Sequence, residues 1–523
     1  MAIPLNRPRL APGPKASGPP ASGLVVIGIV AGGVALLAGL AVAGTNGPVP
    51  IVVMAAIVLG LGFLRWPEAA TVVFIFGLYL NIPAVATNFY GVPALVAAGM
   101  VGLLLIPLGQ RLIDREPVVV APVLPLLVVY LGVLLLSSAA ALTRGLPAQF
   151  EGVELFVTEG IIVFVLVTNV VRTLPTLRHV VWALLVAGAL MGALSVHQAV
   201  TQSYDSNYGG FAQVYGRALE ENEDDEEDTQ PRASGPVGEK NRYAQVMLVL
   251  LPLALLTLWN ERRRWLKLAA GVSALLILTA VVLTFSRGAG VGLALLLLAM
   301  LALRHIKPLH FAAILLGLLL AVILVAPTYG ERIGSLSGVE GLLFEDSEAD
   351  PDGAILGRTT SNLAALNVFL DYPLLGVGPG MYTPHYSRDY ANDLGLRHFT
   401  TSRRAHNLYI ETAAETGVVG LGAFLATIGT TLLLLWRVRR RWLHLRPELA
   451  SWATGFGLAI MAYLTTAIFL HLSYQRYFWL LIALANAAIW ILSRERSEAE
   501  VAAGVPTRQP EEQTGARRAS RCS

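Results

Sequence analysis

Long runs of apolar residues, each about the length needed to cross a lipid bilayer, dominate this 523-residue sequence. Hydropathy and length together predict fourteen such spans. They lie at 23–43, 48–64, 69–88, 92–109, 121–141, 155–171, 179–198, 243–259, 265–285, 288–304, 309–327, 412–436, 451–471 and 474–493. Backbone groups find no water partner in lipid, and the runs are continuously apolar rather than alternating, so helices are expected rather than a β-barrel. The predicted fold class is an all-α polytopic membrane protein.

The composition excludes several classes of protein. Hydrophobic residues make up 55% of the chain and charged residues only 14%, whereas soluble domains carry roughly 25% charged residues. This balance excludes a soluble enzyme, a fibrous protein and a nucleic-acid binder. The single cysteine, Cys522, excludes a disulfide scaffold.

Basic residues recur after every second span and predict the orientation of the chain. This set consists of Arg7, Arg9, Lys15, Arg65, Arg111, Arg115, Arg172, Arg178, Arg262, Arg263, Arg264, Lys267, Arg304, Lys307, Arg437, Arg439, Arg440, Arg441, Arg494 and Arg496. All of them fall on one side if fourteen helices alternate across the membrane. The positive-inside rule assigns that side, and with it both termini, to the cytoplasm.

These spans divide the chain into seven predicted parts. They are a disordered cytoplasmic tail at 1–22, transmembrane helices at 23–198, an acidic extracytoplasmic loop at 199–242, transmembrane helices at 243–327, a large extracytoplasmic loop at 328–411, transmembrane helices at 412–493, and a disordered cytoplasmic tail at 494–523. Residues 220–228 contain eight acidic side chains. We interpret this run as a flexible, solvated insertion, with cation binding as the weaker alternative.

The large loop at 328–411 is too long to be a simple connection, so we expect it to be functional and partly folded. The sequence pattern predicts a short amphipathic helix over residues 361–371. Ser361 is expected to cap its start, and Pro373 prevents it from continuing. Its expected common face consists of Leu363, Leu366 and Phe369. The glycines that follow, at 376, 378 and 380, predict a tight turn that brings the backbone close to another segment.

Several arginines lie on the predicted outer side, against the usual distribution. Among them are Arg232, Arg242, Arg287, Arg358, Arg403, Arg404 and Arg476. Arg287 follows Ser286, a good N-cap, between two apolar spans with almost no loop. An arginine at a helix N-terminus suits a phosphate, because side chain and helix dipole attract the same oxygens. The alternative is an interfacial arginine that binds lipid headgroups.

A second polar cluster lies where the large loop enters the twelfth span. His406 and Asn407 precede that span, and Glu411 and Glu415 lie four residues apart on one face of it. Histidine titrates near neutrality and can transfer protons in catalysis, although an interfacial hydrogen-bonded histidine fits the same position. No second His or Cys stands at metal-ligand spacing, so no metal site is expected.

Taken together and in order, these motifs resemble the O-antigen ligase and polymerase superfamily of bacterial membrane glycosyltransferases. The resemblance covers residues 230–435 and rests on the motif residues Arg232, Gly235, Asn241, Ala244, Ser286, Arg287, Gly288, Arg358, the run from Asp371 to Gly380, His406, Asn407, Glu415, Gly417 and Gly420. It implies a fold similar to glycosyltransferases that use lipid-linked donors, in the bacterial plasma (inner) membrane, with an extracytoplasmic active site and no nucleotide, metal or other cofactor.

The resemblance also implies substrates and residue roles. The donor is a glycan on undecaprenyl diphosphate, and the acceptor is lipid A-core, another glycan chain or a protein. His406 would be the catalytic base, and Arg232, Arg287 and Arg358 would bind the donor diphosphate. Supporting roles would fall to Asn241, Ser286, Arg404, Asn407, Glu411 and Glu415. Within the family, a ligase, a chain polymerase and a protein O-oligosaccharyltransferase remain alternatives.

A polysaccharide transporter or flippase is the competing hypothesis from a different class. A transporter typically shows interrupted helices and polar residues at mid-membrane, in repeated halves. Here the polar motifs lie at the outer ends of the predicted helices, and the two halves of the sequence do not match.

Overall fold

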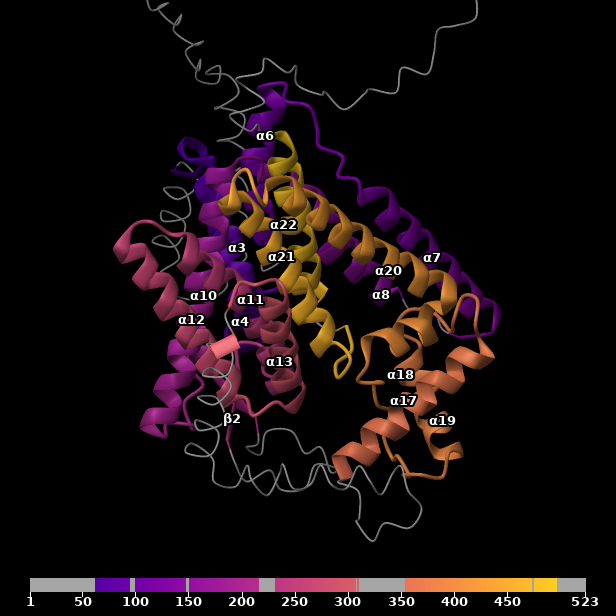
Figure 1. Ribbon diagram of the computed structural model, residues 1–523. Coiled ribbons are helices and arrows are strands. Elements are labelled where there is room, and N and C mark those ends of the chain that lie inside the picture. The colour runs from indigo at the N-terminus through magenta and orange to yellow at the C-terminus, as the bar shows by residue number, and fades with distance from the viewer. Residues whose placement is uncertain are drawn as a thin grey trace, which may run out of the picture.

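The computed structural model describes residues 62–94, 99–146, 150–215, 231–306, 308–309, 353–472 and 475–495. Almost all regular structure in these residues is helical (Figure 1). The elements are α3 (Pro67–Tyr79), α4 (Ile82–Tyr90), η1 (Gly99–Leu104), α6 (Leu105–Ile113), α7 (Leu124–Thr143), α8 (Glu151–Leu155), η2 (Phe156–Ile162), α9 (Val163–Val170), α10 (Leu174–Thr201), η3 (Tyr208–Gly210), β1 (Gln213–Tyr215), β2 (Arg232–Gly235), α11 (Lys240–Asn260), α12 (Arg264–Leu283), α13 (Arg287–Ala302), α17 (Gly353–Asp371), α18 (Tyr382–His385), α19 (Ser387–Asp393), α20 (Leu408–Trp442), α21 (Pro447–Thr466) and α22 (Gln475–Arg494).

Eight of the described helices are long and apolar enough to cross a membrane, and α3 with α4 forms a ninth candidate if this bent pair is one span. The predicted spans 92–109 and 288–304 correspond to shorter apolar helices, Gly99–Ile113 and Arg287–Ala302. The predicted span 23–43, all of 309–327 except its first residue, and most of 48–64 lie outside the described residues. The chain is therefore a polytopic helical membrane protein, and the count of fourteen remains a prediction.

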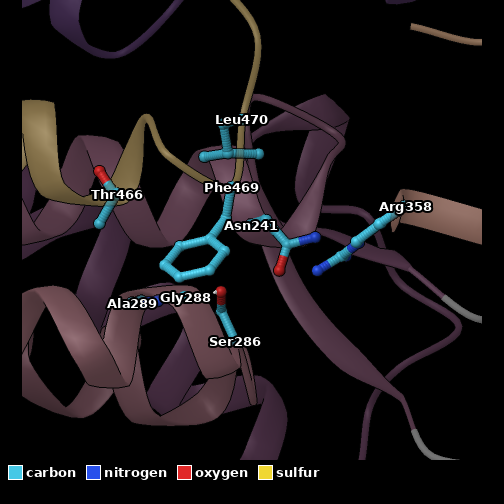
Figure 2. A pocket seen from close by; sticks show the side chains of 8 residues that line it. All are labelled: Asn241, Ser286, Gly288, Ala289, Arg358, Thr466, Phe469 and Leu470. Atoms are coloured by element: carbon cyan, nitrogen blue, oxygen red, sulfur yellow. Dashed lines mark hydrogen bonds between the residues drawn. The ribbon is translucent and has the colours of Figure 1, made fainter. Parts of the chain in front are cut away.

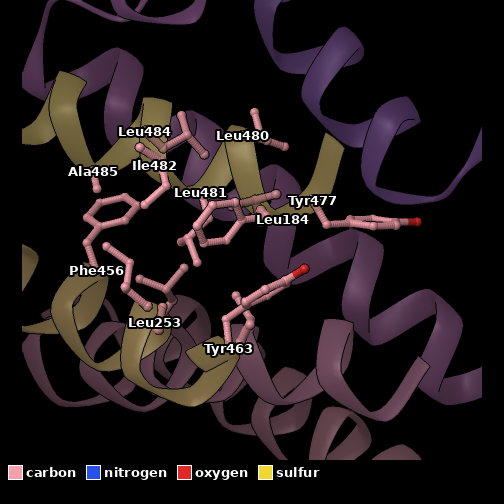
Figure 3. Packing of buried hydrophobic residues seen from close by; sticks show 14 of the residues in the cluster. Leu184, Leu253, Phe456, Tyr463, Tyr477, Leu480, Leu481, Ile482, Leu484 and Ala485 are labelled. Carbon is pink, nitrogen blue, oxygen red and sulfur yellow. The ribbon is translucent and has the colours of Figure 1, made fainter. Parts of the chain in front are cut away.

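Helix α22 forms the centre of the apolar core. Its side chains pack between α10, α11 and α21 with almost no exposure, as Leu184, Leu253, Phe456 and Leu481 illustrate (Figure 3). Burial of an aliphatic or aromatic side chain of this size stabilises a soluble fold by about 1.5–3 kcal/mol, whereas within lipid close packing makes the larger contribution.

The two ends of the helix bundle differ in their polar chemistry. At one end Arg111 and Arg172 both bind Glu116, and Arg178 at the start of α10 pairs with Glu261 beyond the end of α11. The opposite end carries β2, the N-termini of α11 and α13, and α17 to α19 (Figure 1). The outer motifs of the sequence therefore lie together at one end of the bundle.

Within the predicted loop 199–242, β1 and β2 pair as an antiparallel two-stranded sheet, with Tyr215 opposite Arg232. The acidic run at 220–228 lies outside the described residues.

Helix α17 differs from its prediction in both its start and its buried face. The helix begins at Gly353, and Ser361 lies inside it, where its Oγ donates to the carbonyl of Gly357 at 3.0 Å. The predicted cap at Ser361 is therefore wrong; a serine within a helix commonly bonds the carbonyl four residues earlier. The buried face includes Thr360, Ser361, Ala364, Ala365 and Val368, whereas Leu366 is 38% exposed. The predicted end before Pro373 is confirmed.

Helix α20 is interrupted at Gly417, and the glycine-rich loop after α17 packs into the break. Gly417 has φ 67° and ψ −171°, a conformation that is essentially restricted to glycine. Val377 N and Gly378 N donate to the carbonyls of Ala414 and Glu415, both at 2.9 Å, and Val418 N donates to the carbonyl of Pro373 at 2.8 Å. The predicted close approach of the glycine turn to another segment is confirmed, and that segment is α20.

Candidate active site

A small pocket at this end of the bundle unites three of the predicted site residues. Asn241 at the start of α11, Ser286 at the start of α13 and Arg358 on α17 all line it, and their side chains point into the same space (Figure 2). The remaining lining residues are Gly288, Ala289, Thr466, Phe469 and Leu470. We call this space the first pocket.

Asn241 is positioned by the N-terminal cap of α11. The carboxylate of Glu239 accepts hydrogen bonds from the backbone N–H groups of Asn241 and Arg242, at 2.9 and 2.7 Å. It also accepts from Asn241 Nδ2 at 3.0 Å, which fixes the amide at the edge of the first pocket. An acidic cap of this kind satisfies backbone donors that have no partner inside the helix.

Ser286 caps α13 as the sequence predicts. Its Oγ accepts from Ala289 N at 3.3 Å, and Arg287 occupies the first helical position. The Arg287 side chain is exposed and is not among the residues that line the first pocket. The structure thus brings the start of α13 to the pocket, while Arg287 is not part of the pocket lining.

Arg232 begins β2, and the same short motif ends at Gly235, which has φ 54°. A Cβ at Gly235 would lie 2.4 Å from the ring of Tyr243, so only glycine lets β2 approach α11 this closely. The motif places Arg232 at the same end of the bundle as the first pocket, although Arg232 does not line that pocket.

His406 stands directly before α20 in an unusual backbone conformation. Its φ is 53°, in the left-handed region, which costs a non-glycine residue about 1–2 kcal/mol. The next residue, Asn407, caps α20 by accepting from Tyr409 N and Ile410 N at 3.0 and 3.2 Å. Leu408 N donates to the carbonyl of Ala467 at 2.9 Å, which joins this turn to the end of α21. A strained backbone conformation persists only where neighbouring contacts hold it, and the contacts of Asn407 and Leu408 do so for His406.

The surroundings of His406 favour a neutral imidazole. Burial and the nearby cations Arg358, Arg242 and Arg403 together lower the pKa of His406 to about 4, while Glu239 opposes them. The imidazole is therefore unprotonated at neutral pH and has a lone pair with which to accept a proton.

Glu411 and Glu415 hold two separate segments of the outer loop in place. Glu411 accepts from Arg404 Nη1 at 3.2 Å and from Ala405 N at 2.9 Å, directly before His406. The backbone carbonyl of Glu415 accepts from Gly378 N at 2.9 Å. Both glutamates therefore help to anchor the loop on α20.

A larger cavity of about 530 Å³ lies between α7, α8, α20 and α22. Arg404, Glu411 and Glu415 line it, together with Glu159 and Arg476. Arg476 donates to Glu159 through its backbone N at 2.9 Å and through Nη1 at 3.2 Å. We call this space the second cavity.

Sequence reasoning missed His471, which lies between α21 and α22. Its ring contacts the ring of His406 edge-on, with centroids 5.7 Å apart, and its carbonyl accepts from Arg242 Nη2 at 2.6 Å. The two histidines are far apart in sequence, and a single histidine between two spans gives no local signal. Glu239, the N-cap of α11, was missed too, because glutamate is not among the residues usually found at a helix N-cap.

The described residues contain no group of three or more His, Cys, Asp or Glu side chains that could hold a metal ion. The polar groups that gather around His406 are instead guanidinium, amide and carboxylate groups. Guanidinium groups suit anionic oxygens, to which they donate paired hydrogen bonds.

Comparison with known proteins identifies the family of this region. The O-antigen ligase family model matches residues 272–425, from within α12 to within α20. The matched segment contains Ser286, Arg287, Arg358, His406 and Glu415, while Arg232 and Asn241 precede it. No curated protein matches the chain. This match over residues 272–425 supports the resemblance of the chain to the O-antigen ligase superfamily.

Proposed function

We propose that the protein transfers a glycan from an undecaprenyl-diphosphate carrier to an acceptor hydroxyl at the outer face of the plasma membrane. The observation that carries the proposal is the meeting of Asn241, Ser286 and Arg358 in the first pocket, with Arg358 close enough to act on His406. An anion-binding pocket and a proton acceptor side by side are the two parts that such a transfer requires.

The donor diphosphate would bind at the mouth of the first pocket, whose own volume of about 10 Å³ has room for about one water molecule. Arg358 and the N-terminus of α13 would bind its oxygens, and Arg232 and Arg287 would approach from the edges. During the reaction the bond between the anomeric carbon and the phosphate oxygen breaks, and undecaprenyl diphosphate leaves with the electron pair. Fixed cations at the leaving oxygens stabilise the charge that grows there.

His406 would act as the general base. The acceptor hydroxyl loses its proton to the imidazole as its oxygen forms the new bond to the anomeric carbon. Glu411, which binds Arg404 and Ala405, and the Asn407 cap would hold His406 in its orientation. No metal, nucleotide or other cofactor enters this scheme.

The transport hypothesis gains no support from the interruption of α20. An ion or substrate path needs backbone groups that face an open cavity. At Gly417 the described hydrogen-bonding groups are instead taken by the backbone of residues 373–378. The break therefore serves as an attachment point for the outer loop.

Loss of Arg358 tests the donor pocket. In liposomes supplied with a synthetic undecaprenyl-diphosphate oligosaccharide, Arg358→Ala is expected to lower kcat for glycan transfer roughly 100- to 1000-fold, the usual cost of one transition-state donor. The kcat of Arg358→Lys should lie between those of the parent protein and Arg358→Ala, because lysine keeps the charge but cannot donate paired hydrogen bonds. Arg388→Ala is the matched control, since Arg388 is exposed and pairs with Asp389. Transfer by Arg358→Ala at the parental rate would refute the assignment.

The pH profile tests the base. Because only the neutral imidazole accepts a proton and its pKa is lowered to about 4, kcat/KM should hold down to about pH 5 and fall as the pH drops through about 4. Bound diphosphate offsets the cations, so the acid limb of kcat should lie at higher pH than that of kcat/KM. In the residual activity of Arg358→Ala, the acid-side fall of kcat/KM should occur at higher pH, because Arg358 no longer lowers the pKa of His406. Identical limbs in parent and variant would contradict this electrostatic account.

A further inference from the structure

Successive residues of one chain segment line the first pocket and the second cavity. Phe469 and Leu470 line the first pocket, whereas Leu472, Gln475 and Arg476 line the second cavity. His471 stands between them and contacts His406. A second chain segment borders the second cavity through Arg404 and Leu408, and His406 lies between these two residues in sequence. The two histidines therefore mark the boundary between two spaces.

We propose that the second cavity binds the acceptor, and that the acceptor portion held there is an uncharged saccharide. This inference rests on the proposed glycan transfer and adds the place and chemical class of the second substrate. A volume of about 530 Å³ lies within the range of small-molecule sites, roughly 300–1,000 Å³. An acceptor in the second cavity would present a hydroxyl to His406, at the boundary with the first pocket where the donor diphosphate binds.

The polar lining favours sugar hydroxyls over a hydrocarbon. Two ion pairs, Arg404 with Glu411 and Arg476 with Glu159, project from the walls. A lipid tail would strip water from these charges without replacing their hydrogen bonds, which is costly. Hydroxyl groups instead donate to the remaining lone pairs of the carboxylates. The aromatic side chains Tyr130 and Phe156 line the apolar part of the cavity, where the C–H face of a sugar ring can pack.

The charges of the lining disfavour a phosphorylated acceptor. Four carboxyl groups line the cavity, those of Glu151, Glu159, Glu411 and Glu415, against the two guanidinium groups of Arg404 and Arg476. Both arginines already pair with carboxylates. A phosphate would have to break one of these pairs and would then lie beside the carboxylate of Glu411 or Glu159. An uncharged sugar meets neither cost.

Single-cysteine protection tests this division of the two spaces. Cys522 is the only cysteine of the chain, so Cys522→Ser provides a background free of thiols. Phe469→Cys then reports on the first pocket and Leu472→Cys on the second cavity. The full chain in nanodiscs is treated with a small thiol reagent. Probes are undecaprenyl diphosphate and a panel of neutral trisaccharides of glucose, galactose, mannose and N-acetylhexosamines, each also as its 6-phosphate.

We expect at least one neutral trisaccharide to slow labelling of Leu472→Cys tenfold or more and to leave Phe469→Cys unchanged. The 6-phosphate of the same trisaccharide should protect Leu472→Cys at least tenfold less well. Adding Glu159→Gln should weaken protection about tenfold, the usual value of a hydrogen bond to a charged group. Glu116→Gln is the matched control, because Glu116 also pairs with arginines but lies at the opposite end of the bundle.

The opposite results separate the two proposals. Protection of Leu472→Cys by undecaprenyl diphosphate, by phosphorylated sugars as well as neutral ones, or by no saccharide would overturn the acceptor assignment. Failure of undecaprenyl diphosphate to protect Phe469→Cys would instead refute the donor pocket. In that case saccharide protection at Leu472→Cys would still support a sugar-binding cavity.

Discussion

The His406→Asn variant is expected to transfer glycan at least 100-fold, and up to about 10,000-fold, more slowly than the parent protein, the usual contribution of a general base. Asparagine is the informative replacement, because it tolerates the left-handed conformation that His406 adopts at φ 53°. Its amide cannot accept the proton of an acceptor hydroxyl at neutral pH. A loss of activity in this variant therefore reports the missing base rather than a disturbed turn.

Donor binding provides the control for this result. Because the first pocket is lined by Asn241, Ser286 and Arg358 and not by His406, His406→Asn should still bind undecaprenyl diphosphate with near-parental affinity. His398→Ala, at an exposed histidine of the same outer loop, should leave transfer unchanged. Parental turnover by His406→Asn in reconstituted liposomes would remove His406 from the mechanism.

Local features of the candidate site could be predicted from the sequence. The Ser286 cap, the start of a helix just after His406, and the end of α17 before Pro373 each follow from a few consecutive residues. Their physical cause is short-range: a side-chain oxygen satisfies the first backbone donors of a helix, and a proline cannot continue one.

Contacts between distant segments could not be predicted in this way. The contact of His406 with His471 and the boundary that they mark between the first pocket and the second cavity depend on how α20, α21 and α22 pack. Ser137 Oγ donates to the carbonyls of Leu375 and Glu415, at 2.5 and 2.8 Å, across more than 200 residues of sequence. Nothing in the local pattern of α7 identifies Ser137 as a partner of that loop.

Ser361 shows a different reason for an error. Serine satisfies a helix start when it precedes the first turn and bonds a carbonyl when it lies inside a helix. The residue type fits both positions, so the start of α17 depends on what packs beside it. The glycines of the outer loop, by contrast, predicted a close backbone approach without identifying its partner, and the structure supplies α20.

The Gly417→Ala substitution is expected to have the largest effect on stability of any single methyl group added to this site. A Cβ at Gly417 would lie 2.1 Å from the carbonyl oxygen of Leu374 and 2.2 Å from its carbon. Both are backbone atoms, so no side chain can rotate away. Alanine also disfavours φ 67° with ψ −171°, a region that costs a residue with a side chain about 1–3 kcal/mol.

The clash would release the loop from α20. Relief requires the loss of the bonds from Val418 N to Pro373 and from Gly378 N to Glu415, each about 0.5–1.5 kcal/mol. We therefore expect Gly417→Ala to lower the free energy of unfolding by at least ~3 kcal/mol. Thermal denaturation in detergent should show a markedly lower Tm, and glycan transfer should fall with it, because the carbonyls of Ala414 and Glu415 hold the same loop at Val377 N and Gly378 N.

Gly422→Ala is the matched control on the same helix. A Cβ at Gly422 meets no atom within 4 Å, and Gly422 lies in regular helix, where alanine is favoured over glycine by roughly 0.5–1 kcal/mol. Its Tm should therefore equal or exceed that of the parent. Equal Tm values for Gly417→Ala and Gly422→Ala would mean that α20 runs through residue 417 as a continuous helix. The outer loop would then need another attachment to bring His406 to the boundary between the two spaces.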